Sequence, residues 1–318
     1  MATMTHDRAV GGRLRAGLGF ALLSASCFGL SGPLGRGLMD AGWSSAAAVA
    51  VRVLLAGVAL APIAVVRLRG RWHVLRRNAP LITTYGLVAV AGCQVAFFNA
   101  VARMEVGVAL LVEYTAPVAV VGWLWLRHGQ RPTRLTVLGG LLGLVGLVLV
   151  LDLVSGAAIS VAGILWALGA MVGAAAYFVL SARDGDGLPG TALAAGGLLL
   201  GGVALLVAGA VGIVPFEVST SPVAFDGFAV PWWLPVLVLG VVTAAVAYVA
   251  GIAAIRRLGS RLASFVALTE VLSALVFAWL LLGEAPGGVQ LVGGALILGG
   301  VITVKLGEPR PGGRAGTA

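Results

Sequence analysis

Apolar segments of about 20 residues recur along the whole chain, and short segments rich in charge, glycine and proline separate them. About 20 residues at a rise of 1.5 Å cross the ~30 Å hydrocarbon core of a bilayer. Backbone in hydrocarbon must satisfy its own hydrogen bonds, so each segment is predicted to form a helix. Ten such helices are predicted, at residues 16–39, 43–66, 79–102, 107–126, 135–151, 159–182, 190–214, 232–255, 260–282 and 287–305.

The ten predicted helices form two sets of five, at residues 16–151 and 159–305. A polar tail, residues 1–15, precedes the first set, and a second tail, residues 306–318, follows the second. The longest polar interruption, Pro215 to Pro231, is predicted to be a loop and not a domain. The expected fold class is therefore an all-α integral membrane protein of about ten transmembrane helices.

Basic residues are concentrated in alternate connecting segments. If the N-terminus faces the cytoplasm, 18 of the 21 Lys and Arg residues lie on the cytoplasmic side. Only Arg36 and Arg103 lie on the other side, and Arg52 lies within a helix. Because cytoplasmic segments of membrane proteins are enriched in Lys and Arg, this distribution predicts a multi-pass plasma-membrane protein with both termini in the cytoplasm. It also explains the net charge of +9 without a nucleic-acid partner.

The composition excludes a soluble domain and gives no sign of a metal site. Hydrophobic residues make up 60% of the chain and charged residues 10%, whereas soluble domains carry roughly 25% charged residues. Cys27 and Cys93 lie in apolar segments and are expected to be small buried side chains. The three histidines lie far apart in polar segments, without metal-ligand spacing, so neither a metal nor a cofactor is expected.

The second set of helices repeats the first. At a constant spacing of 154 residues, Gly86 matches Gly240 and Trp125 matches Trp279. The same spacing relates Val95-Ala96 to Val249-Ala250, Gly129 to Gly283, Pro132 to Pro286, Gly139-Gly140 to Gly293-Gly294, and Gly146 to Gly300. Five helices is an odd number, so the second set must enter the membrane from the opposite side. Such inverted repeats are typical of secondary transporters, and a purely structural duplication is the alternative.

The duplicated plan and one motif of the second half resemble a known transporter family. Residues 279–286 contain Gly283-Glu284 and lead into a glycine-rich last helix. This segment is similar to the closing turn and helix of the EamA family of the drug/metabolite transporter superfamily. The equivalent turn of the first half has Gln130 where many relatives have Glu. The resemblance implies two five-helix repeats and a transport function.

A second motif resembles a narrower group within that family. Residues 106–117 run from a glycine through a small apolar stretch to Glu113 and Pro117, as in the fourth helix of threonine and homoserine exporters. The segment ending at Glu270 is similar to their ninth helix, with Val271 where relatives have Pro. This resemblance implies export of a neutral amino acid such as threonine or homoserine.

Three ionisable residues lie within predicted helices and are candidates for binding a substrate or a proton. Of the twelve acidic residues, only Glu113 and Glu270 lie in mid-helix, and Arg52 is the single basic residue there. Unpaired charges in hydrocarbon cost several kcal/mol, so such residues face the protein interior and mark solute or proton pathways. Two interpretations of Arg52 remain open: a structural salt bridge to one glutamate, or a contact with a substrate carboxylate while a glutamate holds the ammonium group.

Neutral polar and aromatic residues within the helices extend this candidate site. They are Gln94, Asn99, Tyr114, Tyr248 and Trp166. Gln94 and Tyr248 are equivalent in the 154-residue register, which predicts a shared cavity. Interhelical hydrogen bonds are the alternative for each of the polar side chains.

These features together predict a secondary transporter that works by alternating access, coupled to protons, and exports a small metabolite. Exporters of other solute classes, a channel and a membrane-embedded enzyme are the alternatives. The chain lacks a phosphate-binding loop, a nucleophile with an adjacent base and a set of metal ligands, so we do not expect an enzyme. The expected partners are a small-molecule substrate and the lipid bilayer, with no nucleic acid, and a homodimer is left open.

Overall fold

The computed structural model describes residues 2–104, 106–151, 160–183 and 185–308, and within them the side chains from residue 12 onward except those of residues 106, 107 and 185. Within these residues, nine helical stretches are long and apolar enough to cross a membrane, and Arg134–Val150 is a further, shorter apolar helix. The predicted all-α membrane fold is confirmed. Residues 309–318 of the predicted C-terminal tail lie outside the described residues.

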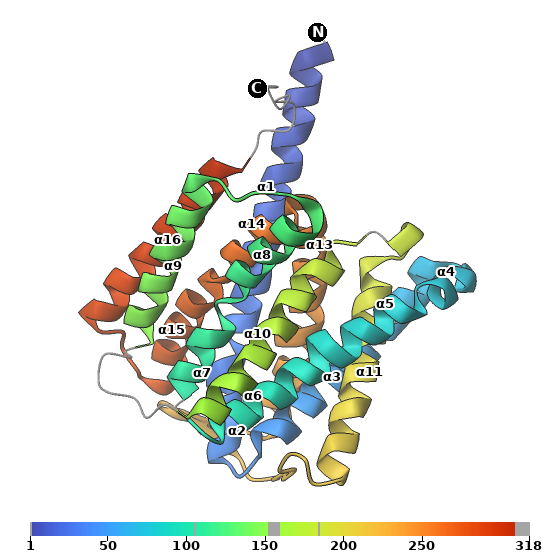
Figure 1. The fold of residues 1–318 in the computed structure, drawn as a ribbon. Coiled ribbons are helices and arrows are strands. Elements are labelled where there is room, and N and C mark those ends of the chain that lie inside the picture. The colour runs from blue at the N-terminus through green and yellow to red at the C-terminus, as the bar shows by residue number, and fades with distance from the viewer. Residues whose placement is uncertain (1, 105, 152–159, 184, 309–318) are drawn as a thin grey trace.

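The first half begins with a long helix and ends with the shorter one (Figure 1). Its helices are α1 (Ala2–Gly29), α2 (Ser31–Asp40), α3 (Ser45–Leu68), α4 (Trp72–Arg77), α5 (Ala79–Thr84), α6 (Cys93–Val101), α7 (Val106–Glu113), α8 (Ala116–His128) and α9 (Arg134–Val150), with a π-helix η1 (Tyr85–Gly92) between α5 and α6. Because α1 begins at Ala2, the helix includes the segment that the sequence analysis assigned to an N-terminal tail. The short helix α4 was not predicted.

The second half has the same plan with one addition. Its elements are α10 (Val161–Ser181), η3 (Gly185–Gly187), α11 (Gly190–Ala210), α12 (Trp233–Gly240), the π-helix η4 (Val241–Val246), α13 (Ala247–Leu258), α14 (Ser260–Ala267), α15 (Thr269–Leu282) and α16 (Gly288–Gly307). The predicted loop 215–231 contains an antiparallel hairpin of β1 (Val223–Phe225) and β2 (Phe228–Val230). Five predicted helices are thus divided, namely the first, third, fourth, eighth and ninth.

Close glycine contacts between α9 and α16 reveal a two-fold relation between the halves. A Cβ added at Gly139 would lie 2.6 Å from the carbonyl oxygen of Gly300, and one at Gly146 would lie 2.6 Å from that of Gly293. In the 154-residue register Gly139 corresponds to Gly293 and Gly146 to Gly300. The two contacts are therefore the same contact with the two halves exchanged. The two helices run antiparallel, since the later residue of one contacts the earlier residue of the other. The contact is closer than any side chain would permit.

Helices α3 and α11 show the same exchange of partners in the register of 145 residues. A Cβ at Gly57 would lie 2.7 Å from the Leu199 side chain, and one at Gly202 would lie 2.5 Å from that of Leu54. Equivalent helices of the two halves therefore cross one another in antiparallel pairs. This is the arrangement expected for repeats related by an axis in the membrane plane.

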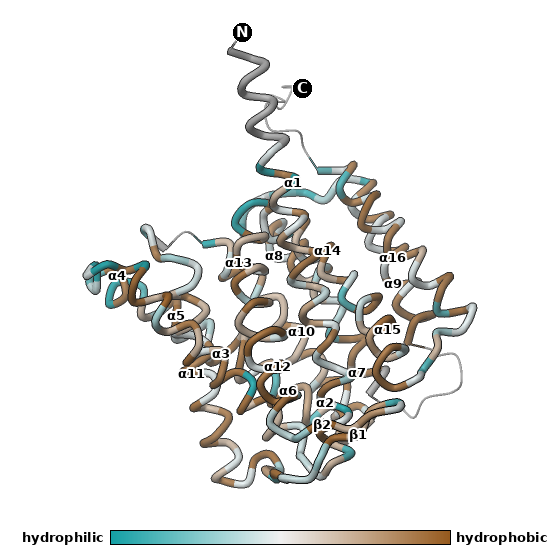
Figure 2. The backbone as a smooth tube through the Cα atoms, turned by 180° about the vertical axis from the view of Figure 1, so that it is seen from behind, coloured by the Kyte–Doolittle hydropathy of each residue, from teal (hydrophilic) through white to brown (hydrophobic). Residues whose placement is uncertain are grey.

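The two ends of the helix bundle differ. The start of α1 and the end of α16 lie at one end, which we call the terminal face (Figure 1). The hairpin lies at the other end, the distal face, and polar residues gather at both ends while the helices between them are largely apolar (Figure 2). The Trp43 indole donates to the Ser219 carbonyl over 2.7 Å, and the Asp226 backbone donates to the Leu281 carbonyl over 2.8 Å. These bonds tie the hairpin loop to the distal ends of the helices.

Candidate functional site

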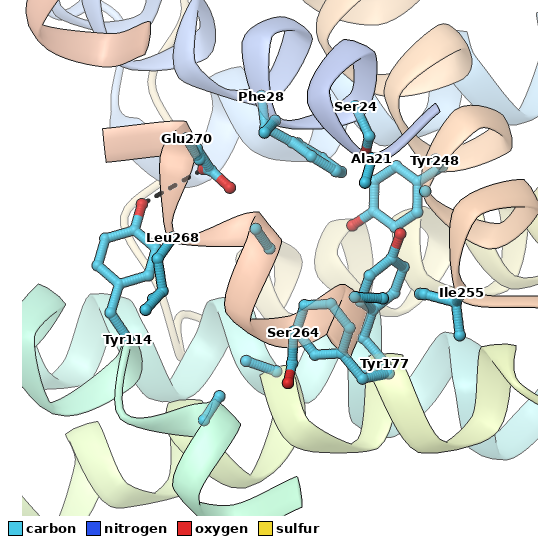
Figure 3. A pocket seen from close by; sticks show the side chains of 18 of the residues that line it. Ala21, Ser24, Phe28, Tyr114, Tyr177, Tyr248, Ile255, Ser264, Leu268 and Glu270 are labelled. Carbon is cyan, nitrogen blue, oxygen red and sulfur yellow. Dashed lines mark hydrogen bonds between the residues drawn. The ribbon is translucent and has the colours of Figure 1, made fainter. Parts of the chain in front are cut away.

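A cavity of about 190 Å³ lies in the middle of the bundle, and we call it the central cavity (Figure 3). Six of the eight predicted site residues line it: Arg52, Gln94, Glu113, Tyr114, Tyr248 and Glu270. The other two do not. The Asn99 amide donates to the Val95 carbonyl one turn earlier in α6, and the Trp166 side chain is 40% exposed on the surface of α10.

Breaks in the fourth and ninth membrane spans bring the two glutamates to the cavity. Helix α7 ends at Glu113, and two residues separate it from α8. One residue separates α14 from α15, which carries Glu270 in its first turn. At each break a threonine hydroxyl donates to the carbonyl three residues earlier. Thr115 bonds Val112 over 2.6 Å, and Thr269 bonds Val266 over 2.7 Å. Such side-chain bonds compete with the helical ladder and bend it.

The two threonines are equivalent in the 154-residue register, so both halves share the cause of the break. Proline is not that shared cause, because the position of Pro117 is occupied by Val271 in the second half. A third break separates α1 from α2, where the Ser31 hydroxyl donates to the Phe28 carbonyl over 2.6 Å. A Cβ at Gly29 would lie 2.7 Å from the Glu270 carbonyl oxygen, so this break packs against the break in the ninth span.

The third and eighth spans each contain a π-helix at equivalent positions, since η1 corresponds to residues 239–246 and η4 covers 241–246. A π turn widens the helix and leaves a carbonyl available to a side chain, and such turns are frequent at functional sites. In η4, the Thr243 carbonyl accepts a hydrogen bond of 2.8 Å from Nη2 of Arg52. The π-helix therefore holds the Arg52 guanidinium at the wall of the cavity.

Arg52 has no carboxylate within ion-pair distance in the described part of the chain. Its guanidinium lies 5.5 Å from the centroid of the Phe28 ring, close enough for a cation–π contact. Its Nε is buried without a hydrogen-bond partner among the described residues. The salt bridge to a glutamate, one of the two interpretations of Arg52 left open by the sequence, is thus not formed in this conformation, and the cation still has a donor to satisfy.

Neutral groups contact the two glutamates. The Cys93 thiol lies 3.4 Å from Oε1 of Glu113, and the Tyr114 hydroxyl donates to Oε1 of Glu270 over 3.3 Å. Glu113 is the last residue of α7, where the helix dipole disfavours a negative charge, whereas Glu270 lies in the first turn of α15, where the dipole favours one. Of the two, Glu113 is therefore better placed to carry a proton.

Aromatic rings form one wall of the central cavity. The rings of Phe28 and Tyr248 meet edge to face at 5.1 Å between centroids, and those of Tyr177 and Tyr248 do so at 5.6 Å. The Tyr177 hydroxyl lies against the Cα of Gly251, where a Cβ would collide with it. Figure 3 shows this tyrosine pair on one side of the cavity and the Tyr114–Glu270 pair on the other.

The sequence analysis did not identify two residues of the site, Tyr177 and Cys93. Both line the cavity, and Cys93 is buried, as expected, but its thiol also contacts Glu113. A usable signal for Tyr177 was that the chain has only four tyrosines, and all four lie within the predicted helices. For Cys93, the only signal was its position next to Gln94.

Three comparisons agree with this architecture and confirm the predicted resemblance to the EamA family. The sequence signature of the EamA-like transporter family matches residues 15–152 and again residues 161–306. The chain is 24% identical over 311 residues to the uncharacterized inner membrane transporter YicL of Salmonella typhimurium, and the match covers 94% of this chain and 98% of the relative. A solved crystal structure with 24% sequence identity matches with a TM-score of 0.72 over 91% of this chain and 96% of that one, so the fold is shared. The chain therefore belongs to the EamA-like transporter family and is a multi-pass membrane transporter.

Proposed function

We propose that the chain is a proton-coupled secondary transporter that exports a small zwitterion, a neutral amino acid such as threonine or homoserine. One observation carries the proposal. Arg52 faces a central cavity without a carboxylate partner among the described residues, and Glu113 and Glu270 line the same cavity. A cavity with a cation at one place and carboxylates at another matches the charges of a zwitterion.

Arg52 is the group proposed to bind the substrate carboxylate. A cation taken out of water without a counter-charge is costly, and an incoming carboxylate would lower that cost. A guanidinium also offers several N–H groups in one plane, which suits a carboxylate. The bond from Nη2 to the Thr243 carbonyl holds the side chain, and the unsatisfied Nε remains for the substrate.

The glutamates are proposed to bind the ammonium group and to carry the proton. No Lys or Arg of the described residues forms an ion pair with either of them, so a substrate ammonium group or a proton can neutralise them in turn. Export in exchange for a proton requires that the two compete for one site. Glu113 is the proposed proton carrier, since it ends a helix and, among the described residues, its carboxylate accepts a hydrogen bond from a thiol alone.

The position of the cavity supports loading from the terminal face. Its lining includes Ile255, which lies near the terminal-face end of α13, and Ser264 in the middle of α14. If that face is cytoplasmic, as the distribution of basic residues predicts, this conformation accepts solute from the cytoplasm. The exchange of equivalent contacts between the two halves would then open the cavity to the other side.

The test is efflux of labelled threonine and homoserine from proteoliposomes under an imposed pH gradient. We expect gradient-driven, saturable efflux for the wild type, and loss of it in Arg52→Gln and Glu113→Gln. An amino alcohol, which lacks the carboxylate, should not compete with substrate in the wild type. Glu217→Gln, which removes an exposed carboxylate of the distal loop, is the matched control and should transport normally.

Three outcomes would contradict parts of the proposal. Absence of efflux in a protein shown to be folded would overturn the amino-acid substrate, and a broad panel of other metabolites would follow. Flux that does not saturate, without exchange of labelled for unlabelled solute, would indicate a channel. Normal transport by Arg52→Gln would overturn the assignment of the substrate carboxylate to Arg52.

A further inference from the structure

A second cavity, of about 270 Å³, lies on the distal side of the helix breaks. It is lined from α2, α7, α9 and α15, and by Glu284 beyond α15. We call it the distal cavity. Apart from Arg36, Tyr114 and Glu284, its lining is apolar.

Tyr114 is the one described residue that lines both cavities. It lies in the break between α7 and α8, and its hydroxyl reaches across to Oε1 of Glu270, 3.3 Å away at the start of α15 (Figure 3). One side chain and one hydrogen bond therefore span the space between the fourth and ninth membrane spans at the level where the two cavities meet.

The break gives this side chain room to change position. Tyr114 and Thr115 separate the end of α7 from the start of α8, so a local change of backbone angles can move the ring without moving a whole span. The equivalent of Tyr114 in the second half is Leu268, which lines only the central cavity and has no hydroxyl. Within the described part of the chain, the second half therefore has no hydrogen bond equivalent to that of Tyr114 at this position.

We propose that the distal cavity is the second half of the solute path, a weak site that holds the transported zwitterion after it passes Tyr114. The Tyr114–Glu270 hydrogen bond is the partition that closes this path in the present conformation. The proposal rests on the proposed function in that the solute must first occupy the central cavity. Glu270 then has two roles, because it can bond either the partition or the solute.

The chemistry of the distal cavity suits release. Arg36 already pairs with Asp40 over 3.2 Å, both side chains are largely exposed, and exposed ion pairs contribute little. Arg36 is therefore a weaker site for a carboxylate than Arg52, whose Nε is buried without a partner among the described residues. A solute that moves from Arg52 toward Arg36 would move from a tight site to a loose one.

Cysteine accessibility tests the partition without knowledge of the substrate. In a background with Cys27→Ala and Cys93→Ser, Ala278→Cys reports on the distal cavity and Ala174→Cys on the central cavity. A small charged methanethiosulfonate is added from either side of the membrane in turn. A minor conformation is populated at roughly 0.1–10%. A cysteine that the reagent reaches only through that conformation should therefore react at least about tenfold more slowly.

With Tyr114 intact, we expect Ala278→Cys to react readily from the distal side, and Ala174→Cys to react at least about tenfold faster from the terminal side than from the distal side. Tyr114→Ala should abolish this difference by raising the distal-side rate, with the terminal-side rate unchanged as evidence of a folded protein. Tyr114→Phe keeps the ring but not the hydroxyl and should raise the distal-side rate in part. The matched control, Phe178→Ala, removes a ring of the central cavity away from the partition and should keep the difference.

Either of two results would overturn the inference. If Ala278→Cys does not react from the distal side, the second cavity is a gap toward lipid and not part of an aqueous path. If the distal-side rate of Ala174→Cys is unchanged in both Tyr114 variants, or rises equally in Phe178→Ala, Tyr114 is not the partition. Because no substrate is used, these outcomes are independent of the efflux assay, so failure of the proposed amino-acid substrate would leave them interpretable.

Discussion

At the scale of single residues, the site depends on polar groups that are held by the backbone. A threonine carbonyl in a π-helix holds Arg52, and Tyr114 and Glu270 hold one another across two helix breaks. None of these contacts neutralises the charge of Arg52 or of the glutamates within the described residues. The charges remain available to a solute, which is the property that a transport site needs and a structural salt bridge lacks.

Gly251 provides a residue-level test of the aromatic wall. A Cβ at this position would collide with the Tyr177 hydroxyl, so Gly251→Ala should push the ring into the central cavity and reduce transport. Adding Tyr177→Phe removes the hydroxyl and should restore part of the transport. The double variant and both single variants are compared by initial efflux rate at saturating and at low solute concentration. Equal transport by Gly251→Ala and the wild type would show that the contact between Gly251 and the Tyr177 hydroxyl does not determine the position of the ring.

At the scale of elements, the broken spans and the π-helices are the features that shape the cavity. The breaks in the fourth and ninth spans and the π-helices in the third and eighth occur at equivalent positions in the two halves, whereas the break between α1 and α2 has no counterpart in α10. The fourth and ninth spans also share the hydroxyl bonds of Thr115 and Thr269. The apolar length of each span keeps it in the membrane, while the breaks bring backbone and polar groups to the protein interior. The spans are therefore apolar toward the lipid and present polar groups at the central cavity.

Removal of a threonine hydroxyl tests whether it maintains the break. Thr115→Val and Thr269→Val lose a hydrogen bond worth about 1 kcal/mol and should favour a continuous helix, with slower transport. Thr303→Val is the matched control, since the Thr303 hydroxyl makes a similar bond of 2.7 Å to Gly299 within the unbroken helix α16. Efflux rate and thermal stability in detergent are measured for all three. A transport loss of the same size in the control would refute the special role of the breaks.

Much of this architecture could be predicted from the sequence, and the rest could not for physical reasons. The ten helices follow from segment length and apolar composition, and the two-fold plan follows from the 154-residue register. The breaks are not visible in this way, because a threonine in a span is equally compatible with an interhelical bond or an i−4 bond such as that of Thr303. Asn99 and Trp166 were predicted near the site on helix membership alone, whereas cavity lining depends on which side of the helix a residue faces.

At the scale of the whole molecule, the two halves pack as crossed equivalent pairs. Contacts between α9 and α16, and between α3 and α11, occur twice with their partners exchanged. In the proposed mechanism the two halves exchange conformations. The path then closes on one side of the membrane and opens on the other. In the present conformation Tyr114 lines both cavities, and its hydroxyl bonds Glu270 between them.

Glycine substitutions test the role of the α9–α16 pair. Gly300→Ala places a Cβ 2.6 Å from the Gly139 carbonyl oxygen, so the helices must separate, at a cost of about 1–3 kcal/mol. The neighbouring Gly299→Ala is the matched control, because no atom lies within 4 Å of its added Cβ. Thermal unfolding in the same detergent should show a lower midpoint for Gly300→Ala than for Gly299→Ala. Equal midpoints would show that close approach at Gly300 contributes nothing.

The central claim is that a zwitterion and a proton use the same cavity in turn. The most direct measurement is the internal pH of proteoliposomes, followed with a trapped pH-sensitive dye when threonine or homoserine is added outside without a preset pH gradient. The account predicts substrate-driven proton movement for the wild type, and none for Glu113→Gln, which should still exchange labelled for unlabelled solute. Solute transport by the wild type without any proton movement would contradict the account.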